Sequence, residues 1–217
     1  MIKKILAAVA LSSVAAAASA GPVLINEGFN NVAGLQGAGW VFTNISQQPG
    51  TPYLQGNADI FAAHSGPANS FISGSYMNAV PGDNGEPAIL NNWLITPEFS
   101  TAGHSIVSFW LRAEDAPGFA DNVSWGFSST GSDPASFTLT PSIVVPVGGW
   151  TKYTFNIASA GIGSTGRFAI NYNGLADTSD YFGLDDLQVA VIPEPASVML
   201  MGLGLAGLVA SRRRKRA

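Results

Sequence analysis

The middle of the chain alternates apolar and polar residues with a period of two, and this pattern limits the possible folds more than any other feature. Segments 122–127, 152–157 and 168–173 alternate in this way, with Trp125, Phe155 and Ile170 among the apolar members. A period of two places successive side chains on opposite faces of a β-strand. Gly, Pro, Asn and Asp separate these segments. In none of the segments do the apolar residues recur with a helical period. We therefore predict an all-β antiparallel sandwich whose strands mostly have one face in water.

Two further patterns predict where this sandwich is buried. Residues 106–111 are almost continuously apolar, which predicts a central strand buried on both faces. Aromatic residues at strand positions are mostly core residues, so we expect this for the tryptophans. The five tryptophans are Trp40, Trp93, Trp110, Trp125 and Trp150. Phe119 lies in a glycine-containing loop and Tyr53 follows a proline, so these two are the better candidates for exposed aromatic contacts.

The charge distribution excludes one class of partner. Residues 21–191 contain 3 basic residues (Arg112, Lys152 and Arg167) and 13 acidic ones, so the net charge of this body is 3 − 13 = −10. A body this acidic is repelled by phosphate backbones, and we expect no nucleic-acid partner. The chain has no cysteine, which excludes disulfides, thiolate metal sites and a cysteine nucleophile.

The N-terminus has the three parts of a secretory signal peptide. Lys3 and Lys4 form a charged start, residues 5–18 are apolar, and Ala18-Ser19-Ala20 is a small-residue cleavage site. The apolar run is short for a membrane anchor and ends at this cleavage site. We therefore predict that residues 1–20 are removed and that the mature protein begins at Gly21.

The C-terminus also has three parts in a fixed order. Pro193-Glu194-Pro195 is followed by an uncharged run over residues 196–210 and a basic cluster over residues 212–216. As a helix, the uncharged run spans about 22 Å, less than the hydrocarbon core of about 30 Å. Flanking arginines extend its reach, so we predict a short transmembrane helix that crosses the inner membrane transiently. The basic cluster stays in the cytoplasm and leaves the body outside.

This order of parts resembles the PEP-CTERM sorting signal of Gram-negative bacteria. The resemblance lies in Val191-Ile192-Pro193-Glu194-Pro195, the Gly/Leu/Met/Ala run that follows and the terminal arginines. It implies that residues 192–217 are a sorting tail with Pro193, Glu194 and Pro195 as its motif. It also implies recognition and cleavage by an exosortase, and delivery to the cell envelope or the extracellular matrix, where such proteins meet exopolysaccharide.

The body resembles a second family, the choice-of-anchor J domains. The resemblance lies in five blocks that occur in the expected order: 25–31, 54–57, 61–66, 92–97 and 181–187, the last reading Tyr-Phe-Gly-Leu-Asp-Asp-Leu. This family is similar to the cleaved-adhesin and MAM-like jelly rolls. The resemblance implies that residues 21–191 form one jelly-roll β-sandwich of adhesive or binding type.

Glu27, Asp185 and Asp186 are the candidate metal ligands. Asp185 has the same parity as Leu187 and Val189, so simple alternation points its side chain toward the core, where an unpaired carboxylate is costly. Carboxylate and carbonyl oxygens suit Ca²⁺, and the jelly-roll resemblance implies a structural calcium held by Glu27 and Asp185. On this parity we expect Asp186 to matter less. The alternative is a β-bulge that turns both aspartates into solvent.

The sequence offers little for catalysis. His64 and His104 are the only imidazoles, each beside a serine, and neighbours in sequence do not make a catalytic triad. The chain lacks the serine-elbow and zinc-protease motifs. We predict a non-enzymatic adhesive or structural protein. The alternatives are a carbohydrate-binding module for exopolysaccharide and, third, an extracellular hydrolase built on paired carboxylates.

Overall fold

The computed structural model describes residues 21–81 and 86–193. The predicted signal peptide, the tail helix and two residues of the sorting motif, Glu194 and Pro195, lie outside these ranges. Residues Gly21–Ile192 form one unit. In the described ranges we find no helix with the length and apolar character needed to cross a bilayer.

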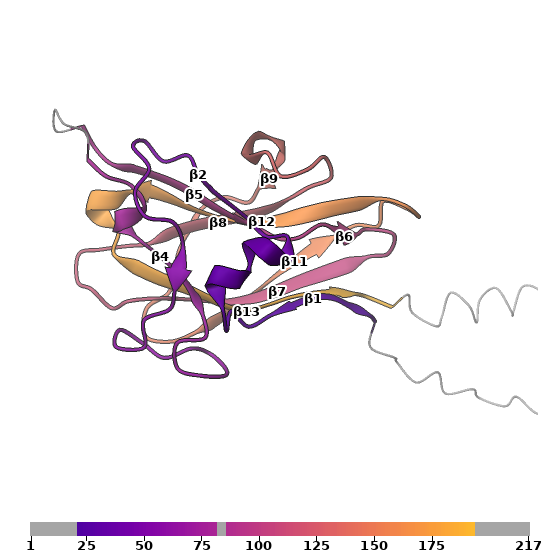
Figure 1. The fold of residues 1–217 in the computed structure, drawn as a ribbon, viewed down its shortest axis with the longest axis horizontal. Helices are drawn as coiled ribbons and strands as arrows, with labels where there is room; N and C mark the ends of the chain where they lie inside the picture. The colour runs from indigo at the N-terminus through magenta and orange to yellow at the C-terminus, as the bar shows by residue number, and fades with distance from the viewer. Residues whose placement is uncertain (1–20, 82–85, 194–217) are drawn as a thin grey trace, which may run out of the picture. The chain divides into compact units, whose positions relative to one another are not determined.

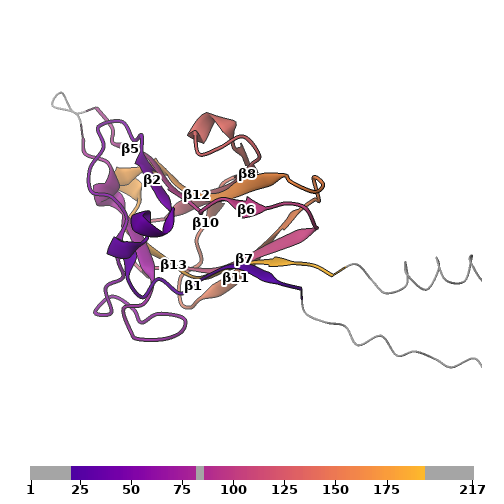
Figure 2. The ribbon, with the colours of Figure 1, turned by 45° about the vertical axis from the view of Figure 1, so that its right-hand side comes forward.

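Two antiparallel sheets make up this unit (Figures 1 and 2). The β7–β13 sheet runs in the order β11 (Thr151–Ile157), β7 (Ser105–Ala113), β13 (Tyr181–Val191), β4 (Ile72–Ser75) and β3 (Leu54–Gln55), and β1 (Val23–Glu27) also pairs with β13. The β5–β12 sheet runs in the order β10 (Ile143–Val144), β8 (Asn122–Ser128), β12 (Thr165–Leu175), β5 (Ile89–Ile95) and β2 (Val41–Asn44). In the same sheet β6 (Phe99–Ser100) pairs with β12, and β9 (Thr138–Leu139) pairs with β8.

The helical residues in the described ranges belong to short 3-10 turns at the ends of the sheets. These turns are η1 (Val32–Gly34), η2 (Gln36–Ala38), η3 (Tyr76–Asn78), η4 (Pro134–Ser136) and η5 (Ala176–Thr178). The predicted all-β antiparallel sandwich is confirmed.

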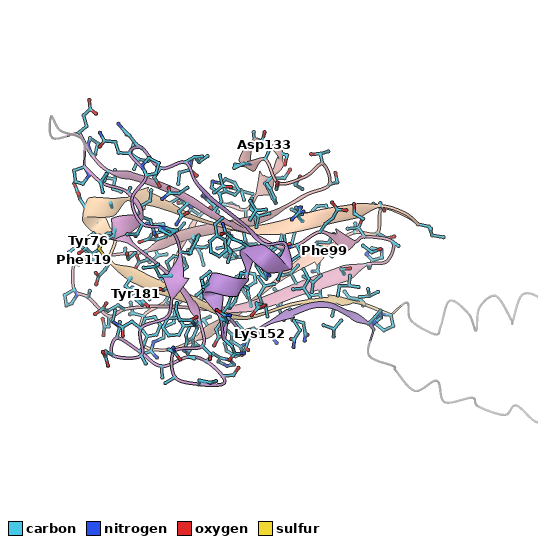
Figure 3. The ribbon with its side chains drawn as sticks, in the orientation of Figure 1. Tyr76, Phe99, Phe119, Asp133, Lys152 and Tyr181 are labelled. Atoms are coloured by element: carbon cyan, nitrogen blue, oxygen red, sulfur yellow. The ribbon has the colours of Figure 1, made fainter. Side chains whose placement is uncertain are left out.

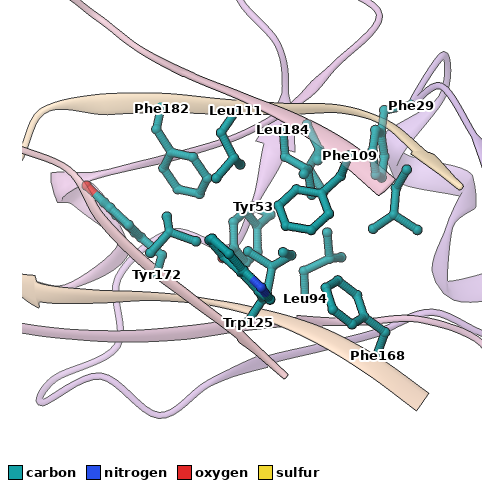
Figure 4. Packing of buried hydrophobic residues seen from close by; sticks show 14 of the residues in the cluster. Phe29, Tyr53, Leu94, Phe109, Leu111, Trp125, Phe168, Tyr172, Phe182 and Leu184 are labelled. Carbon is teal, nitrogen blue, oxygen red and sulfur yellow. The ribbon is translucent and has the colours of Figure 1, made fainter. Parts of the chain in front are cut away.

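The main core lies between the two sheets (Figure 4). Phe109 of the β7–β13 sheet packs against Trp125 and Phe168 of the opposite sheet, with ring centroids 5.2 and 5.6 Å apart. Edge-on and tilted contacts of this kind add to the free energy of burying the rings. Trp40 and Trp93 are also buried, as the aromatic pattern predicts. Phe119 is exposed at the periphery (Figure 3), whereas Tyr53 is buried, so the expectation of an exposed Tyr53 is wrong.

Strand β7 is not buried on both faces, contrary to the prediction from the apolar run over residues 106–111. Its residues alternate strictly between buried and half-buried, so Phe109 points into the core while Ile106 and Trp110 lie on the outer face. The run is nearly all apolar because a loop covers part of that outer face: His64 stacks on Trp110 with ring centroids 3.7 Å apart. Partial cover by a loop selects apolar residues without removing them fully from water.

Strand β13 has two different neighbours along one of its edges. Residues Tyr181–Leu184 pair with β4, whereas Leu187–Ala190 pair with β1. Asp185 and Asp186 therefore lie where one neighbour ends and the other begins. The chain leaving β1 and the loop entering β4 both reach this junction, and it becomes the first candidate site.

Candidate functional site

A β-bulge at Asp186 decides where the two aspartates point. The pairing of β13 with β7 shifts register between Asp185 and Gln188, and Asp186 has a φ of 47°. Asp185 is consequently opposite Trp110, on the outer face of the sheet, while Leu184 and Leu187 both point into the core. The parity prediction for Asp185 is therefore wrong about the face, because the extra residue breaks the alternation. The alternative is right about the bulge but wrong about the exposure of Asp185, which is fully buried.

Backbone amides from a distant loop surround the Asp185 carboxylate. Oδ2 accepts hydrogen bonds from the backbone N–H groups of His64 at 2.9 Å and Ser65 at 3.2 Å, and Oδ1 accepts one from Asp186 at 2.7 Å. Burial raises the pKa of Asp185 to about 6, although these three hydrogen bonds act in the opposite direction. The carboxylate therefore fixes the 64–65 loop to the outer face of β13.

Asp186 binds the side chains of the same loop. Its Oδ2 accepts a hydrogen bond from His64 Nδ1 at 2.6 Å, and its Oδ1 accepts one from Ser65 Oγ at 2.8 Å. The His64 and Asp186 side chains are 29% and 30% exposed. The serine hydroxyl bonds to the carboxylate and not to the imidazole, so these three residues do not form a nucleophile–base pair.

Glu27 approaches this junction from β1. It pairs with Leu187, next to Asp186, and its Oε1 accepts a hydrogen bond from the Phe29 N–H at 2.8 Å. A methyl group on Gly28 would lie 3.7 Å from Asp186 Oδ1, which shows how closely the chain after β1 passes the second aspartate. We name Glu27, His64, Ser65, Asp185 and Asp186 the acidic corner.

The acidic corner fits calcium in part. Among the described residues no three Asp, Glu, His or Cys side chains are arranged to hold a metal ion. Both Asp185 oxygens already accept N–H groups, so this residue is better suited to position the loop than to bind an ion. Glu27 Oε1 and the two Asp186 oxygens have one hydrogen bond each. These two carboxylates, with nearby carbonyl oxygens, are the chemistry that Ca²⁺ prefers.

An aromatic cluster lies beside the acidic corner, on the outer face of the β7–β13 sheet. Phe61 stacks on Phe71 with centroids 5.1 Å apart, and Trp150 packs edge-on against both. Arg112 lies over the Phe61 ring at 4.6 Å. The sequence pattern assigned Trp110 and Trp150 to the main core, but they support the loop that carries His64.

The second candidate site is a cavity of about 520 Å³. It lies at the edge of the β7–β13 sheet that β3 forms, and β11 forms the other edge of this sheet. It opens between β3 and β2, the strands that end the two sheets on this side, and η1 and η2 form one of its walls. Its lining includes five side-chain amides and two aromatic rings but no charged residue: Asn31, Gln36, Asn44, Gln55, Asn92, Phe42 and Tyr53. We name it the amide cavity.

Asn92 is the residue at the inner end of this cavity that sequence analysis missed. It occupies a core-facing position of β5, between Leu90 and Leu94, and it is 1% exposed. Its Nδ2 atom is buried, and among the described residues it has no hydrogen-bond partner. Its backbone carbonyl accepts a hydrogen bond from the Tyr53 hydroxyl at 3.1 Å. A polar residue at an inward position of a strand was the signal that would have revealed it.

The other histidine has no catalytic setting. The His104 carbonyl accepts the Ile192 N–H at 2.7 Å near the end of β13. The neighbouring Ser105 is fully buried and its hydroxyl donates to the Gly103 carbonyl at 3.4 Å. In the described parts of the chain neither histidine ring is hydrogen-bonded to a serine.

Comparisons with known proteins bear on the tail and on the fold. Residues 191–215 match the PEP-CTERM protein-sorting motif, which confirms the predicted sorting signal. This motif is a signal for export and for processing by an exosortase. No curated protein matches the chain.

The body is similar to solved structures of adhesin domains. The K1 cleaved adhesin domain of Lys-gingipain from Porphyromonas gingivalis W83 superposes with a TM-score of 0.58 and 21% identity, over 79% of this chain and 99% of that domain. The K3 cleaved adhesin domain of the same protein gives 0.57 and 22%, over 78% and 98%. This likeness confirms the predicted jelly-roll-like fold.

Proposed function

We propose that this protein is exported, processed at its tail by an exosortase and delivered to the envelope or extracellular matrix, where its sandwich is a non-enzymatic adhesive or structural module. The observation that carries the proposal is the direct join between the sandwich and the sorting signal. The motif match begins at Val191, the last residue of β13, and Pro193 is exposed two residues later.

The two ends of the sandwich support delivery as an intact module. Val23 pairs with Ala190, and the Val191 N–H donates to the Pro22 carbonyl at 2.9 Å. The body therefore begins and ends side by side at one edge of one sheet. Removal of a leader and of a tail at this edge leaves both sheets and their shared core whole.

Tail processing is tested by intact mass in a Gram-negative host that has an exosortase. We expect the wild-type protein to begin at Gly21 and to lack the basic cluster 212–216. Glu194→Ala should keep the tail and accumulate in the membrane fraction. Glu98→Ala, which changes an exposed acid of the body, should be processed normally. Full-length wild-type protein in the cytoplasm would contradict the proposal.

We also propose a structural Ca²⁺ in the acidic corner, with Glu27 and Asp186 as ligands and Asp185 as the residue that positions the loop. Support comes from the convergence of β1, β13 and the 64–65 loop on these carboxylates. An ion that binds only the folded state at about one hundred times its Kd stabilises that state by about 2.7 kcal/mol. A body without disulfides benefits directly from such a bound ion.

The calcium proposal is tested by thermal unfolding in EDTA and in millimolar CaCl₂. We expect calcium to raise the Tm of residues 21–192, and Asp186→Asn to remove most of that increase while tolerating the positive φ at this position. Asp59→Asn, in an exposed part of the neighbouring loop, should keep the full calcium response. Identical Tm values for the wild type in both solutions would overturn the proposed site.

Binding of exopolysaccharide is the second candidate function, and the uncharged amide cavity favours it. The tryptophans do not support an exposed stacking platform, because three of the five are buried and the other two are half-buried in the outer cluster. Hydrolysis has no support in the geometry of either histidine. The candidate for a ligand site is therefore the cavity and not a flat aromatic surface.

A further inference from the structure

The amide cavity has the size of a small-molecule site. Ligand pockets have volumes of about 300–1,000 Å³, and this cavity holds about 520 Å³. It lies where neither sheet has a further strand and where η1 and η2 cover the gap, so side chains of both sheets contribute to one recess. Its occupant can therefore contact both halves of the sandwich.

The lining selects an uncharged and polar occupant. Among the residues that the structure describes, no Asp, Glu, Lys or Arg side chain lines the cavity, so neither an anion nor a cation finds a partner of opposite charge there. A carboxamide offers two N–H donors and one acceptor oxygen. A hydroxyl both donates and accepts, so a ring with several adjacent hydroxyls matches a wall of carboxamides. Phe42 and Tyr53 offer apolar contact for the C–H groups of such a ring.

Not all of these amides are available. Gln55 donates to the carbonyls of Phe29 and Asn69 and accepts the Val32 N–H, and Asn44 is held by Ser46 and Asn78. Gln36 is exposed at the rim. Asn92 lines the cavity, and its Nδ2 atom is enclosed and has no hydrogen-bond partner among the described residues. A buried donor without a partner is costly and calls for an explanation, and an occupant of the adjoining cavity supplies one.

We propose that the amide cavity binds one neutral sugar residue of a polysaccharide, with the Asn92 carboxamide turning so that Nδ2 donates to a sugar hydroxyl or ring oxygen, and Gln36 closing on the sugar from the rim. This site deepens the second candidate function and rests on it. It does not depend on the sorting tail or on calcium. A neutral peptide is the other uncharged and polar occupant, but its donors and acceptors lie along a strand and not around a ring.

The proposal is tested on residues 21–192, which contain both sheets and their whole core. A glycan array of neutral and acidic oligosaccharides identifies the probe, and calorimetry with the best neutral oligosaccharide measures its Kd. Asn92→Leu should weaken binding about tenfold or more, and Gln36→Ala, which lies on the surface, should weaken it about threefold. Asn156→Leu is the matched control, because Asn156 lines a separate cavity of about 340 Å³ at β11.

Each outcome decides the proposal. Binding of a neutral oligosaccharide that is weakened by Asn92→Leu and Gln36→Ala but not by Asn156→Leu supports it. Four results overturn it: no bound neutral glycan, binding of acidic glycans alone, binding of a neutral peptide alone, or a loss of binding confined to Asn156→Leu. The tail-processing assay is a separate measurement, so failure of the sugar site leaves normal sorting in place, and failure of sorting leaves the Kd unchanged.

Discussion

The segment that leaves β1 contributes to both the acidic corner and the amide cavity, since Gly28 passes Asp186 and Asn31 lines the cavity, but the polar groups of the two sites differ in their hydrogen bonding. In the corner, a fully buried carboxylate accepts three backbone N–H groups and its neighbour holds two side chains of the same loop. In the cavity, a carboxamide as deeply buried has an unpartnered Nδ2 among the described residues. The charged group is satisfied by the fold, whereas the uncharged one is not.

This difference separates stability from recognition. A buried group whose hydrogen bonds are complete holds the fold together, and its loss destabilises the protein. A buried group whose hydrogen bonds are incomplete costs the folded state free energy, and a bound ligand that completes them recovers it. Judged by charge and depth of burial alone, Asp185 would have been the better candidate for a binding residue and Asn92 the better candidate for a structural one.

Asp185→Ala should produce the largest effect. The substitution leaves the backbone N–H groups of His64, Ser65 and Asp186 without acceptors, so we expect the free energy of unfolding to fall by about 2–4 kcal/mol at pH 7. Urea unfolding of residues 21–192 measures it, with the exposed Asp59→Ala as control, expected within about 0.5 kcal/mol of the wild type. A loss below 1 kcal/mol for Asp185→Ala would mean that the loop does not depend on this carboxylate.

The pH dependence of stability should also come from Asp185. Its pKa of about 6 in the folded protein is above the unfolded value of about 3.9. The part of its contribution that depends on keeping the carboxyl protonated is therefore fully present below pH 4 and is lost as the pH rises toward 7, while its three hydrogen bonds to backbone N–H groups remain. The shift corresponds to about 2–3 kcal/mol. Unfolding in EDTA between pH 4 and 7 measures it, and Asp185→Ala should flatten the curve. Equal slopes for both proteins would contradict this assignment.

Sequence analysis predicted much of the fold but misplaced the side chains of the corner. The alternation in 152–157 correctly predicted a strand with one face in water, because the pairing of β11 with β7 has no irregularity in its register. The same argument failed at Asp185, since one extra residue at Asp186 reverses the parity and no local signal marks a non-glycine bulge. Glu27 and the two aspartates do converge, but because of the bulge neither aspartate faces the core, and both bind the 64–65 loop.

Gln55→Ala should have an intermediate effect, although Gln55 lines the amide cavity. Its side chain forms hydrogen bonds with the backbone of Phe29, Val32 and Asn69. Like Asp185 in the acidic corner, it therefore stabilises the fold. We expect a loss of about 1–2 kcal/mol in the free energy of unfolding. Gln36→Ala, at the rim of the same cavity, should change it by less than about 0.5 kcal/mol. Equal losses in the free energy of unfolding for the two glutamine variants would mean that Gln55 stabilises the fold no more than Gln36, which only lines the cavity.

The amide cavity could not be predicted from the sequence, for a physical reason. Its lining comes from η1, η2, β2, β3 and β5, which are brought together only when the edges of the two sheets are covered. Asn92 lies in a run that reads as an apolar strand interrupted by two asparagines. Alternation shows that one of the two asparagines faces inward, but it does not show whether its side-chain amide has a hydrogen-bond partner in the folded protein.

Among the substitutions of buried residues, Asn92→Leu should have the smallest effect on stability, and it tests the comparison most directly. Asn78 is the matched control, because both asparagines are 1% exposed. Asn78 accepts the Ser75 N–H at 2.9 Å and donates to the carbonyls of Thr51 at 2.7 Å and Pro52 at 3.1 Å. Asn78→Leu breaks all three bonds, so we expect a loss of about 3 kcal/mol in the free energy of unfolding.

Asn92→Leu removes an unpartnered donor and keeps the Tyr53 bond, which goes to the Asn92 backbone carbonyl. Leucine has the same number of side-chain heavy atoms as asparagine, and its larger methyl groups can extend into the adjoining cavity. We therefore expect a change within about 1 kcal/mol, in either direction. Urea unfolding of the two variants gives the comparison at equal burial. If Asn92→Leu destabilised the protein as much as Asn78→Leu does, the Asn92 amide would be a structural group like the carboxylate of Asp185. The cavity would then have no free donor for a ligand at this residue.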